Sequence, residues 1–334
     1  MGDESSSLPF SHSPILPLFN AMKFGIDLPR DKPYDAVALG LNALDHLIVV
    51  PRYPEFNTKI PFLSHTIAPG GQAATAMVAL ARLGLRARYI GKVGDDDFGR
   101  FQIQSLLSEG VEASGVRTVE GAPSQSAFII IDQESGERTI LWHRDERLTI
   151  EADEVDREAV TSTRALHLDG HDVEASIRAA RFAREEGIPV VIDIDNLYPK
   201  AEELLPLVDF LISSSSFPER LTGERDMKIA LRKMHERTGS CFVAATMGVE
   251  GVMAYFRGRY FHAPAFKVEC RDTTGAGDAF HGGFIYALLA GLSVEETLRF
   301  ANAVAALKCR ALGGRTSLPT LDEVNALLES EAIR

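Results

Sequence analysis

The stretch Asp272-Thr273-Thr274-Gly275-Ala276-Gly277-Asp278-Ala279-Phe280-His281-Gly282-Gly283-Phe284 joins a turn of small residues to an apolar run. Phe280 and Phe284 stand at helical spacing, so we expect a helix to begin near Gly277. Such a turn leaves backbone N–H groups free at the positive end of the helix dipole, where they can hold an anion. Asp278 would lie in the first helical turn, as an ionised base beside this anion hole. Phosphoryl transfer to a hydroxyl needs that arrangement. A plain glycine-rich turn with a capping Asp is the alternative interpretation.

The composition is that of a globular protein and excludes several classes of function. The chain has 334 residues and a formal net charge of -12, which argues against a nucleic-acid surface and does not favour a membrane surface. Three widely spaced cysteines, Cys241, Cys270 and Cys309, offer neither a disulfide framework nor a paired metal site. There is no secretory signal pattern and no long apolar run. We therefore expect a cytoplasmic protein.

The order of elements predicts one α/β domain behind a tail. Residues 1–33 are rich in Ser and Pro, and we expect this tail to be partly disordered. Residues 34–334 form the predicted domain, in which strands alternate with helices; this rhythm implies parallel pairing. We expect strands at 34–40, 88–94, 166–169, 189–193, 209–213 and 242–246, and helices at 73–83, 100–109, 175–186, 228–238 and 293–312.

Two segments distant in sequence, about 46–69 and 123–147, have strand-like alternation and should form a small second sheet. In the first segment, Lys59-Ile60-Pro61-Phe62 suggests an edge strand. We expect this sheet to act as a lid. The apolar face that closes over the site, and on which two subunits could pair, would consist of Phe62, Ile67, Phe128 and Ile130.

The opening stretch and a second string, Gly70-Gly71-Gln72-Ala73-Ala74-Thr75-Ala76, together resemble the two signatures of the ribokinase-like (PfkB) carbohydrate kinase family. The resemblance extends over nearly all of the chain from residue 34. It implies a three-layer ribokinase-like sandwich with a central, mostly parallel sheet and a small β-sheet lid. It also implies an ATP-dependent sugar kinase in which Asp278 is the base and Gly275, Ala276 and Gly277 form the anion hole. The chain lacks the phosphate-binding motif of P-loop enzymes.

The resemblance also assigns binding residues. For the sugar these are Asp45, Gly70, Gly71, Gln72, Thr75 and Asp169, and for the nucleotide Thr246, Gly248, Gly251 and Asn302. Gln72 and Thr75 stand where ribokinase proper has Lys and Asn, which speaks against ribose. The strings around Gln72 and Ser124 look closer to sulfofructose-type kinases. Without the resemblance, Asp45 could equally be a turn-capping residue.

Two metals follow from the same resemblance. Mg²⁺ should travel with ATP, and Glu219 could reach it through water, although the family's Asn-x-x-Glu element is altered in this chain. Asp272, Thr274, Gly313 and Ser317 match a K⁺ site; the alternative is that Asp272 only braces the turn.

Charged residues of the lid could select an acidic substrate. If two of these residues converge, a sugar acid, sugar phosphate or sulfonated sugar is indicated; the candidates are Arg52, Lys59, Arg138, His143 and Arg144. The alternative functions are a nucleoside kinase of the same fold and a non-catalytic sugar or nucleotide sensor. A dinucleotide-binding dehydrogenase is disfavoured, because no G-x-G-x-x-G follows the first strand.

Overall fold

The computed structural model describes residues 22–134 and 138–332, and its central layer is a nine-stranded sheet. The strand order is β13-β12-β11-β10-β9-β8-β1-β4-β5, and all neighbours are parallel except at β11-β12-β13. The strands are β1 Tyr34–Leu39, β4 Ala87–Gly94, β5 Glu112–Val119, β8 Thr163–Leu168, β9 Val190–Ile194, β10 Phe210–Ser214, β11 Phe242–Thr246, β12 Val252–Phe256 and β13 Arg259–Ala263. The inner strands are buried on both faces, as their continuous apolar runs require.

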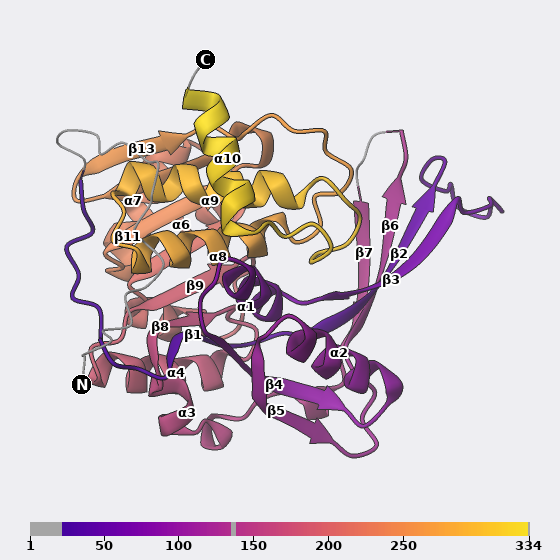
Figure 1. The fold of residues 1–334 in the computed structure, drawn as a ribbon, viewed down its shortest axis with the longest axis horizontal. Helices are drawn as coiled ribbons and strands as arrows, with labels where there is room; N and C mark the ends of the chain where they lie inside the picture. The colour runs from indigo at the N-terminus through magenta and orange to yellow at the C-terminus, as the bar shows by residue number, and fades with distance from the viewer. Residues whose placement is uncertain (1–21, 135–137, 333–334) are drawn as a thin grey trace, which may run out of the picture.

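Helices cover both faces of this sheet and make three layers (Figure 1). One core cluster joins the sheet to α1 Gln72–Arg82, α2 Asp97–Ser108, α8 Ala276–Leu289, α9 Val294–Lys308 and α10 Leu321–Ala332. The opposite cluster joins it to α3 Arg157–Thr161, α4 Val173–Glu185, α5 Ala201–Leu204, α6 Phe217–Thr222 and α7 Met227–Thr238. The predicted α/β sandwich is therefore confirmed. None of the helices in these described ranges could cross a bilayer.

The second sheet projects from one end of the large one (Figure 1). Its order is β3-β2-β6-β7, with β2 Ala43–Val50, β3 Ser64–Gly70, β6 Ser126–Asp132 and β7 Arg138–His143. Asp45 thus lies inside a lid strand, not at the end of β1. The predicted edge strand at Lys59–Phe62 is wrong, because residues 51–63 form no strand. Three prolines in this segment lack the backbone N–H groups that strand pairing needs.

The lid turns the opposite face toward the domain from the one we expected. Ile67 and Phe128 both pair with His46, so they share the outer face, where they are 47% and 46% exposed. The inner face is formed by the alternate residues, which pack with Leu312: Leu47, Ala68, Ala127, Ile129 and Ile131. Period-2 alternation places residues on two faces but does not say which face is inward.

Other boundaries also differ from expectation. The helix predicted to run to Leu312 ends at Lys308, because the chain turns there to place Gly313 N–H on the Asp272 carboxylate (2.8 Å). Strands β5, β12 and β13 were not predicted. Residues 22–33, assigned to the tail, pack along the domain: Phe24 is buried among four other phenylalanines, and Lys23 pairs with Ser293. Residues 1–21 lie outside the described residues.

Candidate active site

A cavity of about 300 Å³ lies between the inner face of the lid, the carboxyl end of β1 and the first turns of α1 and α8. That volume is at the lower end of the usual range for small-molecule sites, about 300–1,000 Å³. It brings together most of the predicted catalytic and sugar-binding residues: Asp45, Gly70, Gly71, Gln72, Thr75, Gly275 and Asp278. Ala276 and Gly277 follow directly at the start of α8.

The turn before α8 is shaped by close backbone packing. Gly275 has φ 77°, and a Cβ there would lie 2.7 Å from Gly314 Cα, so only glycine fits. Thr274 N–H donates to Asp272 Oδ1 (2.8 Å), which fixes the approach to the turn. In the described chain, the N–H groups of Gly277 and Asp278 have no acceptor. The turn therefore presents free donors at the N-terminus of a 14-residue helix, as the sequence predicted.

Asp278 faces the cavity with its carboxylate in a poor environment for charge. Burial raises its pKa to about 7, the nearby Asp193 adds to this, and His281, Lys308 and Arg315 oppose it. A carboxyl that titrates near neutrality can both accept and return a proton.

Asp45 faces the same cavity from β2. Burial raises its pKa to about 7, Arg315 opposes the shift, and Asp278 adds to it. A Cβ on Gly70 would lie 2.0 Å from Asp45 Oδ2, so the glycine makes room for this carboxylate. Arg315 is fully buried behind the cavity wall and holds that wall together through bonds to Asn42 Oδ1 (2.8 Å) and Thr75 Oγ1 (3.2 Å).

Gln72, at the start of α1, is oriented by a chain of hydrogen bonds. The Tyr198 hydroxyl donates its proton to Asp195 Oδ1 (2.8 Å). Its contact with His171 Nε2 (3.0 Å) therefore requires that Nε2 carries a proton and donates it to the hydroxyl oxygen. The same His171 N–H then reaches Gln72 Oε1 (3.0 Å). The amide nitrogen of Gln72 is left to offer its donors to an acceptor in the cavity.

Asp169 lies behind the cavity wall and does not line it. Its Oδ2 accepts from Leu41 N–H (2.5 Å) and its Oδ1 from His171 N–H (3.3 Å), and the residue is 1% exposed. It braces the end of β1 against the loop after β8. Its contact with sugar stays a prediction.

The predicted nucleotide residues meet at the segment that follows β13. Asn302 Nδ2 donates to the carbonyl oxygens of Ala263 (2.8 Å) and Pro264 (3.0 Å). A Cβ on Gly251 would lie 2.1 Å from Ala263 O. Thr246 ends β11, and Gly248 begins the short turn between it and Gly251.

The predicted metal residues are mostly engaged with protein groups. Glu219, on α6, pairs with Arg225 (3.3 Å) and is absent from the cavity wall. The Asp272 carboxylate accepts hydrogen bonds from the N–H groups of Thr274 and Gly313, and Ser317 Oγ donates to Lys308 O. Among residues 22–134 and 138–332, no three His, Cys, Asp or Glu side chains gather to hold a metal ion.

Of the five candidate lid charges, only Arg138 lines the cavity, where it also donates to Thr273 Oγ1. Arg144 is bound to Asp172 (2.7 Å), and the others, Arg52, Lys59 and His143, do not line the cavity. No two of these five charges therefore converge on the cavity, and the condition for an acidic substrate is not met. Trp142, the single tryptophan, lines the cavity beside Ile140.

Sequence reasoning missed several residues of the site. Neither Trp142 nor His171 was assigned a role. Lys308 could have been found, because it continues the buried helical stripe of Ala301 and Val304 with a charged side chain. Arg315 carried no local signal, since its partners lie more than 200 residues away.

Comparison with known proteins agrees with this geometry. Residues 37–321 match the pfkB family carbohydrate kinase model. The chain is 30% identical to a ribokinase of Haemophilus influenzae over 87% of its own length and 97% of the relative's. It is 33% identical to an ATP-dependent ribose-1-phosphate kinase of Halopiger xanaduensis, over 85% and 94%. The structure of Arabidopsis thaliana ribokinase complexed with ribose and ATP superposes with a TM-score of 0.76 at 26% identity, over 89% and 99%.

The chain therefore belongs to the pfkB family of carbohydrate kinases. It is an ATP-dependent phosphotransferase with an alcohol group as acceptor.

Proposed function

We propose that Asp278 removes the proton from a sugar hydroxyl while the turn of Gly275, Ala276 and Gly277 stabilises the transferring phosphoryl group. The free N–H groups of Gly277 and Asp278 lie at the N-terminus of α8, which is the positive end of the helix dipole. They therefore favour negative charge that develops on the phosphoryl group. The raised pKa of Asp278 suits a base that works near neutral pH.

The acceptor sugar would lie between Asp45 and Asp278 under the lid. Asp45 accepts hydrogen bonds from sugar hydroxyls, Gln72 donates to an oxygen, and Trp142 covers an apolar face of the ring. One cation, Arg138, faces this space. A monosaccharide of pentose or hexose size with at most one acidic group fits a cavity of about 300 Å³.

ATP would lie across the turn before α8, with its base near Asn302 and the loop of Thr246, Gly248 and Gly251. Mg²⁺ would neutralise charge on the phosphates, and it commonly uses only one or two protein carboxylates. Glu219 and Asp195 are the acids we assign to it, directly or through water. The unpaired cysteines are consistent with the cytoplasm as the working compartment.

The observation that carries this proposal is that Asp278, its free N–H donors and Asp45 share one cavity. A panel of ribose, fructose, ribose 1-phosphate, a keto-deoxy sugar acid and adenosine, assayed for ADP release, tests it. Saturable turnover of one monosaccharide that disappears in Asp278→Asn is the expected result. Turnover of adenosine alone would assign a nucleoside kinase, and binding without turnover a sensor.

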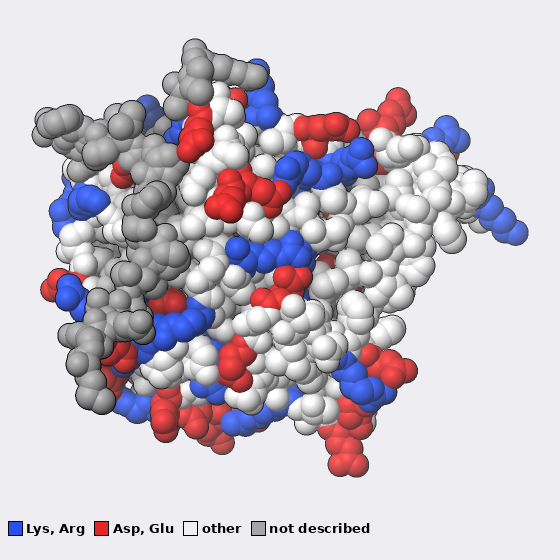
Figure 2. Space-filling model, viewed as in Figure 1, with Lys and Arg blue, Asp and Glu red and all other residues white. Residues whose placement is uncertain are grey.

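We also propose a homodimer through the outer face of the lid. His46 stacks on Phe128 (4.6 Å between ring centroids) and on His65 (5.3 Å), while Phe62 and Leu141 are more than half exposed. The projecting lid carries few charges along the side seen in Figure 2. Exposed apolar surface of this kind marks interaction sites. Sedimentation of the wild type and Phe128→Asp should give a dimer and a monomer; a monomeric wild type contradicts the proposal.

A further inference from the structure

Lys308 is a buried cation behind the anion-hole turn. It is the last residue of α9 and is 0% exposed. Its Nζ donates to the carbonyl oxygen of Asp272 (2.9 Å), and its own carbonyl accepts from Ser317 Oγ. Through its side chain and its backbone carbonyl, Lys308 thus connects the two segments, around Asp272 and Ser317, to which the family resemblance assigns a K⁺ ion.

The residues in this place do not fit a K⁺ ion. Each carboxylate oxygen of Asp272 accepts from one backbone N–H group, at 2.8 Å in both cases. Its carbonyl oxygen already accepts a hydrogen bond from the Lys308 ammonium group. A second cation on the same carbonyl would lie beside the ammonium in a buried place, where like charges repel strongly.

We propose that the Lys308 ammonium group is a built-in cation that takes the place of a monovalent metal ion in this kinase. It holds the Asp272 backbone in position below Gly275 and adds positive charge behind the phosphoryl site. Activity should then not depend on K⁺. The inference rests on the proposed function, because it assigns a positioning residue to the same site.

One observation favours the alternative, in which a metal ion binds here as well. Thr274 Oγ1 is buried and has no hydrogen-bond partner in the described part of the chain. An oxygen of this kind could bind a metal ion beside Lys308, or a substrate atom, since Thr274 lines the cavity. The experiment must therefore separate a chain that uses its own ammonium from one that uses both cations.

The wild-type protein gives the first test, and it needs no variant. Initial rates and unfolding temperature are measured in KCl, NaCl and tetramethylammonium chloride at equal ionic strength. We expect rates within about twofold and equal unfolding temperatures. A saturable activation by K⁺ of about fivefold or more, or a rise in unfolding temperature specific to K⁺, would overturn the proposal.

Two substitutions of the same residue give the second test. Lys308→Met keeps the length of the side chain and removes its charge; we expect kcat to fall about 10- to 100-fold, with the KM for sugar changed little. Lys308→Ala also opens space, so K⁺, NH₄⁺ or methylammonium should restore about fivefold or more of its lost activity, and Na⁺ less. A merely structural lysine would show no rescue by cations. Lys92→Met is the control for loss of a mostly buried lysine elsewhere.

Nucleotide binding distinguishes failure of the proposed function from failure of the Lys308 proposal. The affinity for Mg²⁺ with a non-hydrolysable ATP analogue is measured by calorimetry in K⁺ and in Na⁺. If no sugar in the panel is phosphorylated, equal affinities in the two salts still support Lys308. Wild-type kcat in a folded Lys308→Met, or a folded Lys308→Ala that no cation rescues, refutes it.

Discussion

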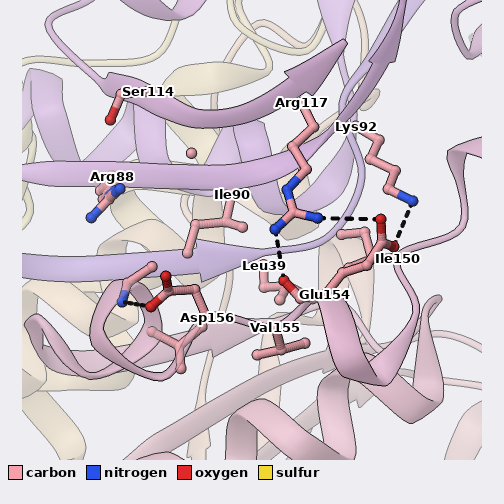
Figure 3. A pocket seen from close by; sticks show the side chains of 14 residues that line it. Leu39, Arg88, Ile90, Lys92, Ser114, Arg117, Ile150, Glu154, Val155 and Asp156 are labelled. Atoms are coloured by element: carbon pink, nitrogen blue, oxygen red, sulfur yellow. Dashed lines mark hydrogen bonds and ion pairs between the residues drawn. The ribbon is translucent and has the colours of Figure 1, made fainter. Parts of the chain in front are cut away.

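The cavity between β4 and β5 and the cavity under the lid are both lined by charged side chains, and they differ in how those charges are balanced. In the cavity of about 200 Å³ between β4, β5 and the segment before α3, Arg117 and Lys92 both reach Glu154 (3.2 and 2.6 Å), as Figure 3 shows. Arg88 is likewise paired with Glu112 (2.8 Å). Under the lid, by contrast, Asp45 and Asp278 have no ion-pair partner among the described residues.

This difference separates support from function. Where buried cations share neighbouring carboxylates, their desolvation is offset within the fold. Where carboxylates are buried without partners, the fold bears a cost that a ligand or a proton must offset. Replacing residues of the two cavities should therefore have opposite effects on activity and on stability.

The largest effect is expected from Asp278→Asn. Turnover should fall about 10²-fold or more, as loss of a general base predicts, while ATP still binds. Stability should rise at pH 8: the pKa of Asp278 is raised in the fold, so its ionisation above pH 7 costs stability, and Asn carries no charge. Steady-state kinetics and thermal unfolding at pH 8 measure both. Turnover near the wild-type value would show that another group is the base.

The second effect concerns Asp45→Asn. An amide can replace only part of the hydrogen bonding of a carboxylate, so the KM for sugar should rise about tenfold or more, with kcat/KM for ATP nearly unchanged. The split between the two substrates is the informative result. An equal loss for ATP and sugar would mean that Asp45 supports the fold and not the acceptor site.

The part of the site formed by residues close together in the chain could be predicted from the sequence. Gly275 and Asp278 belong to one turn, so a short string contains the whole anion hole and its base. Asp45 fell just outside the predicted lid segment, which began near residue 46, because the start of β2 depends on pairing with residues 64–70, which are distant in the chain. The helical stripe could show that Lys308 is buried but not that it reaches Asp272, which is 36 residues away. The inward face of the lid could not be known before Leu312 was seen to pack on it.

The third effect is on pH dependence. Both Asp278 and Asp45 have pKa values raised to about 7, and both act as carboxylates in the proposal. Raised values mean that the active form is lost as pH falls, so kcat/KM for sugar at pH 6 should be about tenfold or more below its value at pH 8. Rates between pH 5.5 and 9 at saturating Mg²⁺ and ATP measure it. A flat profile over this range would contradict the role of both acids.

The smallest effect on activity, and the one that tests the comparison from the other side, is that of Lys92→Met. The Lys92 side chain is 9% exposed, and its Nζ also donates to Thr149 O (2.7 Å), so the variant leaves Glu154 with only Arg117 as a charged partner. We expect the free energy of unfolding to fall by about 1 kcal/mol or more, because a partly buried pair is broken from one side. Activity should stay within about twofold, since none of these atoms line the cavity under the lid. Denaturant unfolding and sugar kinetics on the same preparation measure both effects.

Glu154→Gln is the matched variant on the acidic side, and it should have the same effects on stability and activity as Lys92→Met. If either variant lost activity as Asp278→Asn does while remaining folded, the paired cavity would be functional and the distinction between the two cavities would fail.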